Sequence, residues 1–237
     1  MIPWQLLDTA KVPGGEGELR LYQRGDEFSI RIDGRELMNS RVYGSEDALA
    51  DLACARVAER ERPRVLIGGL GVGYTLAAAL RGLGQDAEVV IAELSPAVVR
   101  WNRGPLSHLA EHPLRDKRVQ VREGDVAEVM RSDRGAYDAI MLDVDNGPDG
   151  LTRKSNDWLY GPAGLLAART ALRAKGVLAV WSAGGDRGFV RRLERAGFDV
   201  EEVGVRAREG GRGSRHTIWL ATASGKRSGP GAPSRAR

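Results

Sequence analysis

Short apolar runs alternate with helix-like segments over most of this chain, and this alternation limits the fold more than any other feature. The runs are VLIGG, EVVIAEL, RVQVREGD, YDAIMLD and GVLAVWS, which start at residues 65, 88, 118, 137 and 176. Most are continuous in apolar residues instead of alternating, which is typical of strands covered on both faces of a sheet. Strands that alternate with helices predict βαβ units, in which right-handed crossovers join parallel strands.

Helical spacing of apolar residues marks the segments around these strands. We expect helices at residues 74–82, 96–102, 157–174 and 187–196. A further helix is expected at residues 45–59, with Ser45 as its N-cap and Glu46 and Asp47 in the first turn, where carboxylates are favoured.

Two hairpins complete the predicted fold. Near the N-terminus, Asp33-Gly34 joins the strand-like runs EFSIRI and RELM, and Asp-Gly is a strong hairpin signal. Near the C-terminus, strands at residues 199–205 and 216–221 are joined by the loop REGGRGS and are expected to pair antiparallel at the sheet edge. The sequence therefore predicts a doubly wound, Rossmann-like α/β fold with a mostly parallel seven-stranded sheet and a small N-terminal β-hairpin element.

The positive charge of the chain is concentrated at its C-terminus. The formal net charge of +4 equals the four basic residues in the last fifteen, so the remainder is neutral. That tail is rich in Ser, Gly and Pro and cannot bury a core. We therefore expect a β-hairpin element at residues 1–44, an α/β domain at 45–222 and a disordered basic tail at 223–237, and nucleic acid is not an expected partner.

Cysteine and histidine usage argues against a metal site. One cysteine, Cys54, excludes a disulfide scaffold and a cysteine-cluster zinc site. His108 and His112 are four residues apart, but Pro113 follows directly and the pattern offers no acidic third ligand. The chain has no uncharged apolar stretch of about 18 residues and no basic start followed by an apolar block. We expect a cytoplasmic protein with no metal and no membrane partner.

Glycines or acids follow four successive predicted strands, and ligands of open α/β sheets bind at the carboxyl ends of strands. Glycines let the backbone approach a ligand closely, and a carboxylate about 20 residues further on accepts ribose hydroxyls in such folds. Taken singly, each feature has a simpler explanation: a tight turn, a solvated strand end or a helix cap. The ordered set is more specific than any member. Its sequences are Gly68-Gly69-Leu70-Gly71-Val72-Gly73, then Glu93, then Glu123-Gly124-Asp125, then Leu142-Asp143-Val144-Asp145-Asn146.

This ordered set resembles the class I S-adenosylmethionine-dependent transferases, and among them the spermidine synthase (polyamine aminopropyltransferase) family. The resemblance covers residues 27–220 and includes the Asp-Gly hairpin, a Ser-Glu-x-x-Leu helix start, GG-x-G-x-G, Ala-Glu-Leu, Gly-Asp-Val, and Tyr-Asp-x-Ile-x-x-Asp followed by Gly-Pro. It implies that Gly69, Gly71 and Gly73 lie under the nucleoside and its sulfonium. It implies that Glu93 holds the ribose and Asp125 the adenine amine.

The resemblance also implies an acidic site for a small-molecule amine acceptor. Asp143 would be the base and charge anchor, and Asp145 falls one residue short of the second acid in the family's Asp-x-x-Asp pair. The amine would approach beneath residues 146–160, with Glu46 nearby. Turn chemistry explains Asp145 and Asp149 equally well. The aromatic candidates for the amine's methylene chain are Tyr43, Trp158 and Tyr160, for which packing is the alternative.

Several positions depart from the family pattern on the amine side. Gly71 stands where the family carries an acid, Gly44-Ser45-Glu46 replaces Tyr-His-Glu, and Arg153 and Lys154 add positive charge. The co-substrate is therefore open between decarboxylated and ordinary S-adenosylmethionine. Aminopropyl transfer to an amine, in polyamine biosynthesis, is the favoured function. A small-molecule methyltransferase and a noncatalytic nucleoside-binding homologue are the alternatives, and a homodimer is implied by the resemblance alone.

Overall fold

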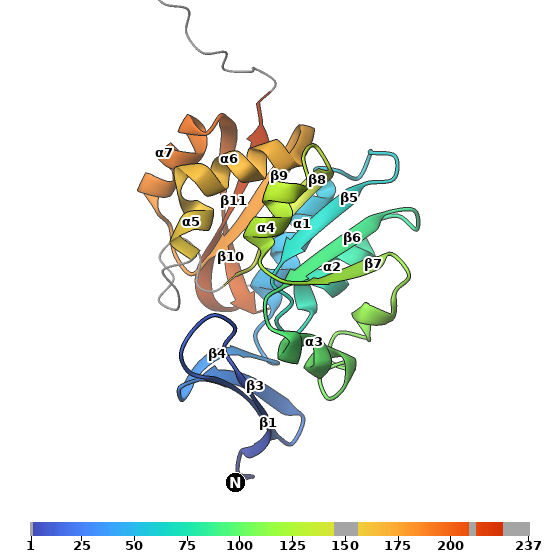
Figure 1. The fold of residues 1–237 in the computed structure, drawn as a ribbon, viewed down its shortest axis with the longest axis vertical. Coiled ribbons are helices and arrows are strands. Elements are labelled where there is room, and N and C mark those ends of the chain that lie inside the picture. Colours follow the sequence, from blue (N-terminus) through green and yellow to red (C-terminus); the bar gives the residue numbers. More distant parts are fainter. Residues whose placement is uncertain (1, 145–155, 209–211, 225–237) are drawn as a thin grey trace, which may run out of the picture.

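A computed structural model describes residues 2–144, 156–208 and 212–224 of this chain. Its centre is a seven-stranded sheet in the order β10-β11-β9-β8-β5-β6-β7 (Figure 1). Five neighbouring strands, from β9 to β7, are parallel, and β11 pairs antiparallel with both β9 and β10. The predicted fold class and the predicted C-terminal hairpin are confirmed. The strands are β5 (Arg64–Gly68), β6 (Glu88–Glu93), β7 (Val119–Glu123), β8 (Tyr137–Leu142), β9 (Leu172–Ser182), β10 (Phe198–Arg208) and β11 (Arg212–Ala223).

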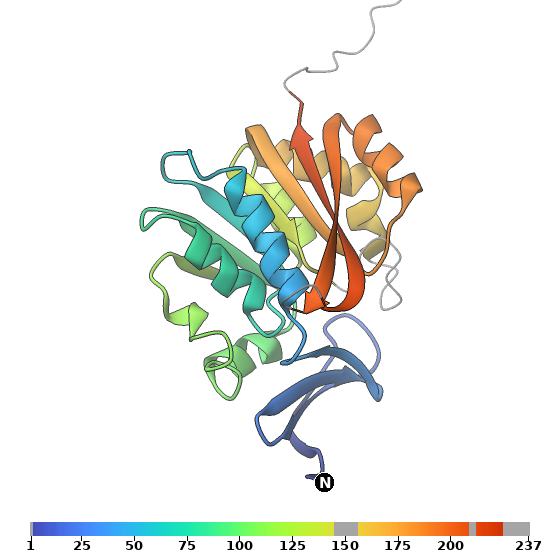
Figure 2. The ribbon, with the colours of Figure 1, turned by 180° about the vertical axis from the view of Figure 1, so that it is seen from behind.

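Helices cover both faces of this sheet, which explains why its strands are apolar throughout. Along β5, Val65 and Ile67 belong to the core beneath α1, α2 and α3, whereas Leu66 belongs to the core beneath α4 to α7. Figure 2 shows α1 and α2 across one face, and Figure 1 shows α4 to α7 across the other. The helices are α1 (Gly44–Ala55), α2 (Tyr74–Gly82), α3 (Pro96–Arg103), α4 (Val126–Ser132), α5 (Asn156–Tyr160), α6 (Pro162–Ala171) and α7 (Arg187–Arg195), with a 3-10 turn at Pro113–Arg115.

Two helix predictions are wrong in detail. Ser45 is not the N-cap of α1, because the helix starts one residue earlier with Tyr43 at the cap, and Ser45 is buried inside the first turn. The predicted helix at residues 157–174 is two helices, α5 and α6, because Gly161 is extended and Pro162 starts a new helix. Its last residues belong to β9, which begins at Leu172.

The N-terminal element is a four-stranded antiparallel sheet and not only a hairpin. It consists of β1 (Gln5–Lys11), β2 (Glu18–Arg24), β3 (Glu27–Ile32) and β4 (Arg35–Asn39). The expected turn joins β3 to β4, with Asp33 at φ 46° and Gly34 at φ 82°, values that the primed hairpin turns require. The first strand was not predicted, because nearly all its side chains are exposed and give no alternating pattern.

The inner face of this small sheet is continuous with the core of the α/β part. Leu21 and Ile30 lie in the same buried cluster as Leu49 of α1 and Trp101 of α3. Trp101 Nε1 also donates a hydrogen bond of 2.7 Å to Asp8 Oδ2 on β1. The sheet is therefore held against the α/β part, as Figure 1 shows. The proposed boundaries at residues 44 and 222 stay predictions, and residues 225–237 of the tail lie outside the described residues.

Within the described residues, no helix has the length and apolar character needed to cross a membrane.

Asp138, near the start of β8, is buried with two arginines. Its carboxylate accepts hydrogen bonds from Arg60 Nη1 at 2.9 Å, from Arg173 Nη1 at 2.7 Å and from the Arg64 backbone N–H at 2.8 Å. It thereby joins the loop after α1 to β5, β8 and β9. The two arginine side chains are 29% and 41% exposed, so the removal of Asp138 leaves them to solvent and leaves the Arg64 N–H without its acceptor.

We expect Asp138→Ala to lower the free energy of unfolding by about 2 kcal/mol, because three hydrogen bonds to a charged group are lost, measured by urea denaturation. Glu18→Ala is the control, because it removes an exposed ion pair with Arg20 and should cost less than about 1 kcal/mol. A loss for Asp138→Ala as small as that of the control would contradict a structural role for the buried group.

Candidate active site

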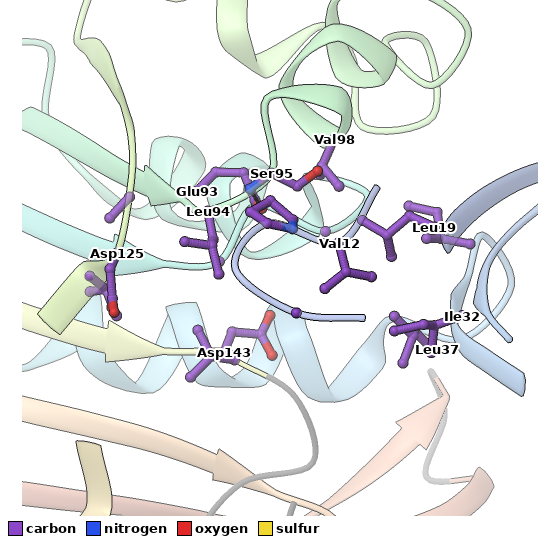
Figure 3. Close-up of a pocket in the computed structure, with 18 of the residues that line it drawn as sticks. Val12, Leu19, Ile32, Leu37, Glu93, Leu94, Ser95, Val98, Asp125 and Asp143 are labelled. Atoms are coloured by element: carbon purple, nitrogen blue, oxygen red, sulfur yellow. Dashed lines mark hydrogen bonds between the residues drawn. The ribbon is translucent and has the colours of Figure 1, made fainter. Parts of the chain in front are cut away.

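A cavity of about 250 Å³ lies between the carboxyl ends of the parallel strands and the N-terminal sheet. Residues that follow β5, β6, β7 and β8 line one side, and apolar residues of the N-terminal sheet line the other. Figure 3 shows this arrangement, with Glu93, Asp125 and Asp143 on the strand side and Val12, Leu19, Ile32 and Leu37 facing them. Of the described residues predicted for the nucleoside and the reacting centre, Gly69, Gly71, Glu93, Asp125 and Asp143 line this cavity, whereas Gly73 lies outside the lining.

The glycine loop after β5 needs glycine at two positions for different reasons. Gly69 has φ 90°, and a Cβ there would lie 2.5 Å from the Asp143 carbonyl oxygen, so the loops after β5 and β8 approach too closely for a side chain. Gly73 has φ 95° at the N-cap of α2, a left-handed conformation that favours glycine. Gly71 carries no side chain into the cavity, and its carbonyl accepts a hydrogen bond from Asn102 Nδ2 at 2.8 Å.

Glu93, at the end of β6, is fixed by the backbone on both carboxylate oxygens. Oε2 accepts from the Leu70 N–H and Oε1 from the Ser95 N–H, both at 2.8 Å. The side chain is buried but lines the cavity. Because a carboxylate oxygen has two lone pairs, these bonds orient Glu93 and still leave it able to accept from a ligand.

Asp125, after β7, is the N-cap of α4. Its Oδ1 accepts a hydrogen bond of 2.8 Å from the Ala127 N–H, so the capping explanation offered by the sequence is correct. The residue also lines the cavity, at the end opposite to the N-terminal sheet in Figure 3. The cap uses one oxygen, so capping and ligand binding are compatible for this side chain.

Asp143, after β8, lies where the cavity meets a second, smaller one of about 100 Å³. Thr75 Oγ1 of α2 donates a hydrogen bond of 2.7 Å to Asp143 Oδ2. Burial raises the pKa of Asp143, and the hydrogen bond from Thr75 opposes this increase in part. Asp143 is therefore held by a neutral donor and forms no ion pair with any lysine or arginine of the described chain.

Glu46 of α1 lines the second cavity, and no lysine or arginine of the described residues lines that cavity with it. Burial, followed by the nearby charge of Asp143, raises the pKa of Glu46 to about 7. Tyr74, Thr75 and Trp181 also line this cavity. Two carboxylates with raised pKa values therefore share one site, which is typical of residues that exchange protons or bind cations.

The remaining predicted residues do not all reach these cavities. Asp145 and Asp149 lie outside the described residues, as do Arg153 and Lys154. Tyr160 is 3% exposed, packs edge-on against Phe189 and donates to the Val144 carbonyl, so it is a core residue. Tyr43 stacks on Tyr74, and Trp158 lies against Arg131; neither lines a cavity.

Sequence analysis missed two groups of lining residues. The first is the apolar face of the N-terminal sheet. Alternating apolar residues in β2 and β3 indicate that such a face exists, but they do not show what it faces. The second is Trp181 of β9, whose position inside an apolar strand suggests only packing. Nothing in the local pattern shows that either faces the strand ends.

No cluster of three or more His, Cys, Asp or Glu residues that could hold a metal ion occurs in the part of the chain that the structure describes.

Comparison with known proteins gives a partial sequence match and many similar solved structures, two of which are described below. Over 131 residues, the chain is 32% identical to polyamine aminopropyltransferase 1 of Streptomyces coelicolor, an alignment that covers 54% of this chain and 22% of that protein. The chain thus spans about a fifth of the length of this curated relative. No family model matches the chain.

The structural matches extend over nearly the whole chain. The crystal structure of spermidine synthase from Thermotoga maritima matches with a TM-score of 0.71 at 18% identity, over 92% of this chain and 73% of that one. A spermidine synthase in complex with the transition state analogue AdoDATO matches with a TM-score of 0.70 at 17% identity, over 92% and 72%. These likenesses show that the chain has the fold of the spermidine synthases.

We expect the stability of the protein to fall as the pH rises from about 4.5 to about 7, because Glu46 keeps its proton in the folded state and loses it in the unfolded chain over that range. Glu46→Gln should make this loss about 2–3 kcal/mol smaller, measured by urea denaturation at pH 4.5 and pH 8.

Glu59→Gln, which alters an exposed glutamate outside both cavities, is the matched control and should follow the wild type. Identical pH dependence of wild type and Glu46→Gln would show that Glu46 has no raised proton affinity.

Proposed function

We propose that this chain is a spermidine synthase-like transferase that moves an aminopropyl group from decarboxylated S-adenosylmethionine to a small amine. One observation carries the proposal: the two joined cavities are lined by acids, and no lysine or arginine of the described residues lines either of them. Both the sulfonium donor and the amine acceptor are cations, so an acidic lining favours both. The acids are Glu16, Glu46, Glu93, Asp125 and Asp143. The partial match to a polyamine aminopropyltransferase supports the same reaction.

The larger cavity fits the nucleoside part of the donor. Glu93, fixed at both oxygens, offers its remaining lone pairs to the two ribose hydroxyls. Asp125 offers the oxygen that the helix cap does not use to the exocyclic amine of adenine. Gly69 and Gly71 leave room for the sulfur end, which then faces Asp143. These roles stay proposals for each residue.

The reaction needs a neutral amine, whereas an alkylamine is mostly protonated at pH 7 because its pKa is near 10. The amine nitrogen attacks the carbon next to the sulfonium sulfur. A carbon–nitrogen bond forms, the carbon–sulfur bond breaks, and its electron pair stays on sulfur, so that methylthioadenosine leaves as a neutral thioether. Asp143 and Glu46 attract the cationic acceptor and accept the proton that its nitrogen releases. The raised pKa of Glu46, about 7, suits a proton acceptor at neutral pH.

Decarboxylated donor is preferred in this proposal for an electrostatic reason. Ordinary S-adenosylmethionine carries a carboxylate that would enter a site already containing Asp143 and Glu46. The resembling family carries an acid at the position of Gly71, and a Cβ at this position would lie 3.2 Å from Met38 Sδ. The donor's amine therefore depends on Asp143 and on Asp145, the predicted second acid, which lies outside the described residues. A cytoplasmic homodimer stays an expectation of the resemblance.

The proposal is tested by incubating the protein with decarboxylated donor and a diamine and measuring methylthioadenosine. We expect turnover, and we expect Asp143→Asn to lower kcat by about 10²–10⁴-fold because the base is lost. Binding of methylthioadenosine should persist, since the Asn side chain still accepts the hydrogen bond from Thr75. Asp26→Asn, in the exposed turn between β2 and β3, is the matched control. Folded wild-type protein that yields no product with diamines of three to five carbons would reject the function.

Donor choice is tested separately by calorimetry. We expect decarboxylated S-adenosylmethionine to bind at least about tenfold more tightly than ordinary S-adenosylmethionine, because the latter brings a carboxylate next to two acids. A preference for the carboxylated donor would instead support methyl transfer to a small molecule.

A further inference from the structure

A chain of hydrogen bonds leads from Glu46 away from the cavity. Ser45 Oγ donates a hydrogen bond of 2.7 Å to Glu46 Oε2. Ser45 Oγ also lies 3.0 Å from His216 Nδ1 of β11. Ser45 is 1% exposed, so its hydroxyl has this pair of neighbours in place of water. Three side chains from α1 and β11, 171 residues apart in sequence, therefore form one connected path.

The path begins at the cavity wall and ends near the surface. Glu46 lines the smaller cavity, whereas Ser45 and His216 do not. The His216 ring is only partly buried, and it packs edge-on against Trp181, which lines the same cavity, with 4.9 Å between ring centroids. Trp181 thus separates His216 from the cavity, and Ser45 provides the connection between His216 and Glu46.

We propose that Ser45 and His216 are the proton exit of this site: they carry a proton from Glu46 to the solvent side of β11. This inference rests on the proposed function, which requires the acceptor amine to lose a proton. Both residues act through Glu46 and do not touch substrate, so they are positioning residues.

The step balances without a further reactant. When Glu46 is protonated it becomes the donor, and the Ser45 hydroxyl turns from Glu46 to His216; Glu46 then gives its proton to Ser45 Oγ as the Ser45 hydroxyl gives its own to His216 Nδ1. One O–H bond breaks at Glu46 and one forms at Ser45, while the original Ser45 O–H breaks and an N–H bond forms on the imidazole. Glu46 is again a carboxylate, and the imidazolium releases a proton to water from Nε2.

Burial and charged neighbours act on both ends of this path. Asp143 and Asp47 face Glu46 with negative charge, and with burial they raise the pKa of Glu46 to about 7. Burial lowers the pKa of His216 below its ordinary value of 6.5. Arg206 of β10 and Arg215 of β11 lie opposite each other, next to the pair formed by Val205 and His216. Both shifts favour the proton on Glu46, so its transfer to His216 is completed by release to water.

Coupling between the two ends is measured by ¹⁵N NMR titration of the His216 imidazole, which does not depend on turnover. We expect Glu46→Gln to shift the His216 midpoint downward by about half a pH unit, because a carboxylate that favours the imidazolium is lost. In a Ser45→Ala background the same change should have little effect. A shift that is equally large without the Ser45 hydroxyl would overturn the path.

Kinetics tests whether the path serves the reaction. We expect Ser45→Ala and His216→Gln each to lower kcat about tenfold at neutral pH with unchanged affinity for methylthioadenosine, and we expect added imidazole to restore kcat. His108→Gln and Ser132→Ala are the matched controls, since both residues are exposed and line neither cavity. Unchanged kcat in both variants, or a loss that imidazole does not restore, would overturn the proposal. NMR coupling in a protein without transferase activity would support the path and reject the proposed function.

Discussion

The account depends on one carboxylate that is held without a cation. Asp143 lines two neighbouring cavities, and among the described side chains its hydrogen-bond partner is the Thr75 hydroxyl. Burying a charge without a counterion costs free energy, which is why its pKa is raised. A bound cation removes much of that cost, so the folded protein favours a positively charged ligand at this point.

The two aspartates of β8 and its carboxyl end show how environment separates structural from functional acids. Asp138, near the start of the strand, is neutralised by Arg60 and Arg173 and joins several elements. Asp143, just beyond the strand's other end, has a neutral donor and an acidic neighbour, Glu46. Asp143 follows the carboxyl end of β8, where the loops after β5, β6, β7 and β8 line the cavity. Asp138 lies near the other end of the strand. The same residue type therefore pairs with arginines at one end of β8 and faces a cavity without a cationic partner among the described residues at the other.

Local patterns predicted the strands of the α/β sheet, the residues that follow them and the Asp33-Gly34 turn, because each depends on neighbours in sequence. Errors arose where packing decides. Ser45 has the chemistry of an N-cap, but α1 begins earlier and buries it beside His216. The covering of the cavity by the N-terminal sheet, and the place of Trp181 in its wall, depend on contacts between elements far apart in the chain. Such contacts leave no local signal.

The most direct test of the central claim is a crystal structure of the protein with methylthioadenosine and a diamine. Our account places the ribose against Glu93, the adenine near Asp125, the sulfur facing Asp143, and an amine nitrogen between Asp143 and Glu46. An empty cavity at saturating ligand, or a nucleoside bound away from these strand ends, would contradict it.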